Sequence, residues 1–229
     1  MVYICVTDAV VLLAGAITYS LGAAVSGEVA PGDLGRPTPC ADWDLGTLLR
    51  HLAESMATLS EALTTGNVGV NPAQVSGDGA VGVSGPGCGS GLGCGSGSDS
   101  GVRGDLVEVL RDRATELLCA AFAVDEPLIR VEGILVPRGI IVAAGAVEIA
   151  VHGWDVSVAC GGLARVPAEL AGPLVRELPQ LIDVRDGLFG PPVAVPALAC
   201  PGVRLVAYLG RDPSRHQWLL ASSIGVSST

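Results

Sequence analysis

The sequence predicts a mainly α-helical protein, a four-helix bundle with a small C-terminal appendage and an insertion rich in glycine and serine. Three observations lead to this fold class. Apolar residues recur at the helical period in several long segments. Most connections between these segments are short, as they are in helical bundles. One long stretch in between has a composition that cannot form a packed core.

The four bundle helices are expected within residues 1–164. The first should span Thr7–Val25. The second should begin after Asp44, a good N-cap residue, and its apolar positions follow the helical period. The third should span Asp105–Ala123, followed by an irregular segment over residues 124–138. The fourth should follow Pro137 and end at Gly161–Gly162, because glycine commonly ends helices.

Two regions lie outside this pattern. Residues 66–104 are dense in glycine and serine, so we expect a flexible insertion or lid. Residues 165–229 form the appendage, with a helix over Pro167–Asp183, a proline-rich extended stretch and a short helix over Val203–Leu209. The chain of 229 residues therefore suits one domain with a small addition.

Charge and composition exclude several functional classes. The formal net charge of -10 leaves no basic surface for nucleic acid. All 13 basic residues are arginine, which removes Schiff-base chemistry and the P-loop lysine. The seven cysteines include no CxxC pair, so neither a disulfide framework nor a cysteine zinc site is indicated.

The apolar stretch Ala9–Ala24 is shorter than the roughly 20 residues that a membrane span needs. It also lacks the basic region that begins a signal peptide. We therefore expect a buried first helix, no membrane association and a cytoplasmic protein.

A candidate metal site lies in the fourth predicted helix. Glu148 and His152 are four residues apart in an apolar run, so they share one helix face. His51 borders the apolar face of the second predicted helix. Two helices that supply two histidines and a glutamate predict a three-ligand zinc site with an open position. The alternative is that Glu148 and His152 hydrogen-bond each other while His51 lies at the core boundary.

Four segments resemble a known family: PTPCADWDLGTLLRHL (residues 37–52), EIAVHGWDVSVACG (148–161), FGPPVAVP (189–196) and LGRDP (209–213). They are similar to DinB-like metal-binding proteins of actinobacteria related to the N-terminal domain of mycothiol-dependent maleylpyruvate isomerase. The resemblance implies that His51, Glu148 and His152 bind zinc or a similar divalent ion. It also implies a small thiol such as mycothiol as cosubstrate.

The sequence allows two roles for each of several other side chains. Asp155 is expected either to orient a ligand histidine or to make an ordinary surface contact. Arg204 and Arg211 could bind an anionic substrate. The simpler interpretation is that each forms a salt bridge on the surface. Cys40 is read as a small buried residue rather than a reactive thiol. No catalytic residue is assigned.

The resemblance implies a metal-dependent isomerase or thiol S-transferase that acts on an electrophilic small molecule. One alternative is a biosynthetic enzyme that uses the metal as a Lewis acid without a thiol. Another is a bundle that only binds a small ligand. The expected partners are therefore small molecules, and a homodimer is left open.

Overall fold

The computed structural model describes residues 4–26, 33–40, 43–68, 99–123, 126–162, 165–182 and 189–214. For residues 99–105 it describes the helical backbone alone. The other residues, which include most of the glycine- and serine-rich insertion and His216, lie outside the described part of the chain.

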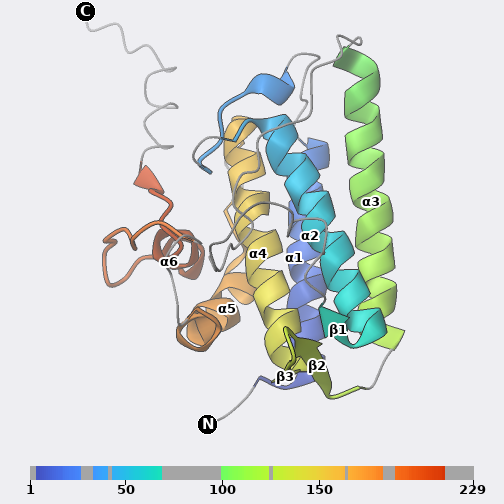
Figure 1. Ribbon diagram of the computed structural model, residues 1–229. Helices are drawn as coiled ribbons and strands as arrows, with labels where there is room; N and C mark the ends of the chain where they lie inside the picture. The colour runs from blue at the N-terminus through green and yellow to red at the C-terminus, as the bar shows by residue number, and fades with distance from the viewer. Residues whose placement is uncertain are drawn as a thin grey trace, which may run out of the picture.

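Four long helices run alongside one another and form the body of the molecule (Figure 1). They are α1 (Val6–Ser26), α2 (Leu45–Thr65), α3 (Asp99–Ala123) and α4 (Arg138–Ala159). Helix α4 packs along α1 and also contacts α2, so most of its side chains are buried. The predicted mainly α-helical bundle is confirmed, and its central helix is the one that carries Glu148 and His152.

Several helix ends follow local signals that the sequence contains. The side chain of Asp44 caps α2 by accepting a hydrogen bond from the backbone N–H of Thr47 at 2.7 Å. The same helix ends at Gly66, whose φ of 67° is the left-handed conformation typical of a C-terminal cap. Gly161, with φ of 74°, follows α4. These caps explain why the predicted ends of α2 and α4 are close to the observed ones.

Two predictions about connections were wrong. Residues predicted to be irregular form a hairpin of β2 (Leu128–Val131) and β3 (Ile134–Pro137), and β1 (Asn67–Val68) pairs with β2 in parallel. The hairpin turn contains Glu132 at φ 48° and Gly133 at φ 86°, and a glutamate is an uncommon residue at positive φ. Helix α3 begins at Asp99 instead of Asp105. The later start was predicted because Gly101 and Gly104 lower helix propensity, yet the helix continues through both.

The C-terminal region adds two shorter helices beside the bundle. Helix α5 (Ala168–Leu181) contacts α4 and α1, and α6 (Pro201–Tyr208) packs on α5 and reaches α4 (Figure 1). The buried positions of α5 recur at the helical period, and they are Leu170, Ala171, Leu174 and Leu178. The chain then returns to α4, where Leu209 and Arg211 are buried.

Among the described residues, α1 and α4 are long and apolar enough to cross a membrane by length and composition alone. Much of each is buried inside the bundle, 50% of the most apolar stretch of α1 and 72% of that of α4. Buried core helices of soluble proteins can be equally long and apolar, so length and composition are weak evidence for a membrane span.

Helices α1 and α4 approach each other closely at Gly153, next to His152. A Cβ atom at Gly153 would lie 2.9 Å from Cα and 3.0 Å from Cβ of Ser20 on α1. Gly153→Ala is therefore expected to push the helices apart and to lower the free energy of unfolding by about 1–3 kcal/mol. Urea unfolding followed by circular dichroism measures this. Gly22→Ala is the control, because a Cβ atom there meets nothing within 4 Å. Equal stability of both variants would contradict the close approach.

Candidate metal centre

Side chains from two helices converge on one carboxylate oxygen. Oε1 of Glu148 lies 2.9 Å from Nε2 of His51 on α2 and 3.1 Å from Nε2 of His152 on α4. One donor atom from each residue lies within 4.8 Å of the other two. The structure therefore brings together the three residues that the sequence suggests as metal ligands.

The three side chains are not equally buried. His152 has 6% of its side-chain surface exposed, against 16% for His51 and 30% for Glu148. The cluster is thus closed on the His152 side and reachable on the Glu148 side. This arrangement leaves a direction from which a small molecule could approach.

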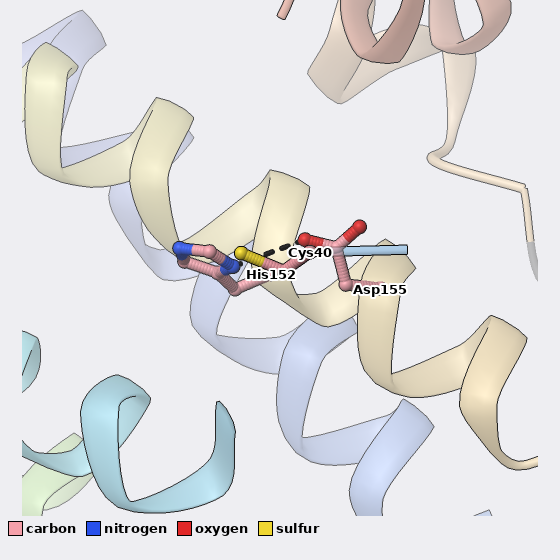
Figure 2. Close-up of side chains that lie close together, drawn as sticks. All are labelled: Cys40, His152 and Asp155. Carbon is pink, nitrogen blue, oxygen red and sulfur yellow. Dashed lines mark hydrogen bonds and ion pairs between the residues drawn. The ribbon is translucent and has the colours of Figure 1, made fainter. Parts of the chain in front are cut away.

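A second carboxylate holds the far side of the His152 ring. Oδ2 of Asp155 lies 3.0 Å from Nδ1 of His152 (Figure 2), and Asp155 is fully buried. Arg211 donates from Nη2 to the same oxygen at 2.9 Å and from Nε to Oδ1 at 3.4 Å. Arg211 also donates from Nη1 to the carbonyl of Leu209 at 3.0 Å. A buried chain of contacts therefore runs from Arg211 through Asp155 to His152.

These contacts determine which ring nitrogen carries the proton when His152 is neutral. Asp155 is paired with Arg211, and an ionised carboxylate only accepts hydrogen bonds. Nδ1 of His152 must therefore donate to Asp155. In a neutral imidazole the other nitrogen, Nε2, then has a lone pair and no proton. That lone pair faces the Glu148 carboxylate at 3.1 Å, so two acceptors would oppose each other unless a cation lies between them.

Without a metal, the positive charge would have to come from a proton. Burial lowers the pKa of His152, but Glu148 and Asp155 outweigh burial and raise this pKa to about 9. Burial also raises the pKa of Glu148, yet His152 and then His51 outweigh it and hold this pKa well below its usual range. Both shifts indicate a site that favours a positive charge beside an ionised carboxylate.

Trp43 covers the two histidines. Its ring centroid lies 4.5 Å from that of His51 and 6.1 Å from that of His152, with which it stacks at an interplanar angle of 26°. Trp43 belongs to the segment that leads into α2 from η1 (Asp33–Gly35). Trp43 therefore contacts the rings of both histidines.

The remaining residues singled out in the sequence lie in different environments. Arg204 is exposed on α6, whereas Arg211 is buried against Asp155. Two further residues near the site were not expected there. Tyr19 on α1 has a raised pKa, because of burial and of the nearby Asp155 charge. Cys40 lies beside His152 and Asp155 (Figure 2), and its place just before the His51 helix was the one signal available in the sequence.

The mainly α-helical bundle is consistent with the DinB-like fold. Residues 20–157 match the family described as mycothiol maleylpyruvate isomerase N-terminal domain. The chain belongs to this family, since the match covers more than half of its length. The matched part contains His51, Glu148, His152 and Asp155, and it ends before Arg204 and Arg211. Neither the curated proteins nor the solved structures contain a match to the chain.

Proposed function

We propose that His51, Glu148 and His152 bind one divalent metal, with zinc as the first choice and iron or nickel as alternatives. The observation that carries this proposal is the convergence of Nε2 of His51, Oε1 of Glu148 and Nε2 of His152, with Asp155 at 3.0 Å from Nδ1 so that Nε2 is the nitrogen of His152 left to bind a metal. Two imidazoles and a carboxylate form a donor set found in catalytic zinc sites. The proposed metal would supply an open position at which a thiol is bound and its deprotonated form is favoured.

The residues around the three ligands would keep them in place. Asp155 fixes the ring of His152 through Nδ1, and Arg211 fixes Asp155. Carboxylates that hold the second nitrogen of a ligand histidine set its tautomer and raise its basicity. Trp43 shields both histidines, so Glu148 marks the more accessible side.

The reaction that this arrangement supports is thiol chemistry on an electrophilic small molecule, either isomerisation or S-transfer. Membership of the family supports a mycothiol-related role. In an isomerisation, a thiol adds to an activated double bond, the resulting single bond rotates and the thiol leaves. In an S-transfer, the new carbon–sulfur bond is kept. Mycothiol is the proposed cosubstrate in both cases.

Asp155→Asn is expected to weaken zinc binding by roughly 10–100-fold, the usual effect of losing such a partner of a ligand histidine. The amide cannot carry the negative charge that pairs with Arg211, and it can present a donor to Nδ1 of His152. A zinc titration against a competing chelator measures the change. Asp112→Asn, at an exposed position on α3, is the matched control. Unchanged zinc affinity in Asp155→Asn would contradict the role given to Asp155.

Thiol use is tested by thermal unfolding in the presence and absence of metal. If the thiol binds at the metal, mycothiol should raise the melting temperature of the zinc-loaded protein and leave the zinc-free protein unchanged. Turnover of an electron-poor alkene or epoxide should require the thiol and be lost in Glu148→Ala. Turnover that needs zinc but no thiol would favour the Lewis-acid alternative. Neither a shift nor turnover would favour a bundle that only binds a ligand.

A further inference from the structure

The hydroxyl of Ser55 contacts the proposed metal centre and not the backbone of its own helix. Its Oγ lies 3.4 Å from Nε2 of His51, one turn earlier on α2. Helical hydroxyls elsewhere in the described chain donate to the backbone carbonyl four residues earlier, and they belong to Thr18, Thr64, Thr65 and Thr115. Ser55 could make the same bond to the carbonyl of His51. The contact that the structure gives it is with the imidazole instead.

Ser55 lies on the accessible side of the cluster. Two contacts show that α2 and α4 run in opposite directions: His51 meets Glu148, and further along α2 the carbonyl of Leu63 accepts a hydrogen bond from Arg138 at the start of α4. A step from His51 to Ser55 therefore leads past Glu148 and away from the buried histidine. Glu148 is the most exposed of the three proposed ligands, and Ser55 is partly exposed as well.

A metal on His51 would remove the present acceptor of the Ser55 hydroxyl. The lone pair of Nε2 can accept a hydrogen bond or bind a metal, but it cannot do both. The ligand atoms of a tetrahedral zinc ion lie roughly 3.3–3.6 Å from one another. Oγ of Ser55 lies at a similar distance, 3.4 Å, from Nε2 of His51. The hydroxyl is therefore at the edge of the space that the ligands of a metal would occupy.

We propose that Ser55 binds the cosubstrate by donating a hydrogen bond to the thiol sulfur at the open position of the metal centre. The inference rests on the proposed function and adds to it a residue that contacts the thiol. A deprotonated sulfur only accepts hydrogen bonds, and a bond to a charged acceptor is stronger than one between neutral groups. The competing explanation is that metal binding turns the hydroxyl back to the carbonyl of His51, where it would contribute nothing to thiol binding.

The test uses the full-length protein loaded with cobalt(II), an ion that suits the same nitrogen and oxygen ligands and absorbs visible light. Titration with 2-mercaptoethanol, followed by the sulfur-to-cobalt absorption band, measures thiol affinity without the rest of any larger cosubstrate. Ser55→Ala should weaken thiol binding roughly 10-fold, the effect of losing one hydrogen bond to a charged group. Its zinc affinity, from competitive titration, should equal that of the wild type.

Two variants serve as controls. Ser55→Thr keeps the hydroxyl and should bind the thiol nearly as the wild type does. Ser60→Ala removes another partly buried serine from α2 and should change neither zinc affinity nor thiol affinity. A loss that is confined to Ser55→Ala and restored in Ser55→Thr would support the proposal.

The outcomes separate this proposal from the proposed function. A wild-type protein that binds neither cobalt nor zinc would contradict the metal centre, and the role of Ser55 with it. A wild type that binds metal and thiol, alongside Ser55→Ala with unchanged thiol affinity, would overturn the role of Ser55 alone. Equal losses of zinc and thiol affinity in Ser55→Ala would also overturn it, because the hydroxyl would then act by holding His51.

Discussion

Replacing His152 by alanine is expected to abolish stoichiometric zinc binding while the helical bundle stays folded. His152 would supply one of three donor atoms, and it is held between Glu148 and Asp155. Loss of an outer partner such as Asp155 already costs roughly 10–100-fold in affinity, so loss of a ligand should cost more. Competitive zinc titration measures the affinity, and circular dichroism measures the fold.

The control for this variant is Ser157→Ala, which also removes a buried polar side chain from α4 but none of the proposed ligands. It should bind zinc as the wild type does. If His152→Ala binds zinc with wild-type affinity, His152 is not a ligand. If both variants lose zinc together, the effect comes from damage to the helix and not from the lost imidazole.

Arg138→Met is expected to cause a large loss of stability, on the order of 3 kcal/mol. Arg138 is 1% exposed at the start of α4. Its guanidinium donates to the carbonyl of Leu63 at 3.1 Å and to those of Ala120 and Ala121 at 3.0 and 3.5 Å. These carbonyls lie in the last turns of α2 and α3, where backbone acceptors lack partners within the helix. Methionine would fill part of the space and leave the acceptors unpaired.

Urea unfolding of Arg138→Met should show this loss directly. Arg130→Met is the matched control, because Arg130 is in the neighbouring hairpin and is exposed, and its guanidinium donates to the nearby carbonyl of Gly133 at 3.1 Å. Its stability should change by less than about 0.5 kcal/mol. Equal effects of the two substitutions would show that Arg138 does not join the ends of α2 and α3.

The features that could be predicted from the sequence are those with a local signal. The helical period and the Asp44 cap predicted α2, and the four-residue spacing of Glu148 and His152 predicted that they share a face. The hairpin of β2 and β3 has a weaker signal, because Gly133 in its turn is preceded by Glu132, which has a conformation usually taken by glycine or asparagine.

The surroundings of the site depend on contacts between distant parts of the chain. Arg211 lies 56 positions beyond Asp155, and no periodic pattern relates the two. Cys40 was expected to be a small buried residue, but it is partly exposed beside His152 and Asp155. Its position depends on the turn that Thr38 stabilises and on how that turn packs against α4. Packing of this kind leaves no mark on the sequence, so these neighbours required the structure.

The most direct test of the central proposal is elemental analysis of the wild-type protein, purified without chelators and without an affinity tag that binds metal. We expect one divalent ion per chain, zinc most readily, retained through desalting and lost in His152→Ala. Protein that contains no metal as purified, and that retains none after incubation with zinc and desalting, would contradict the proposal that His51, Glu148 and His152 form a metal centre.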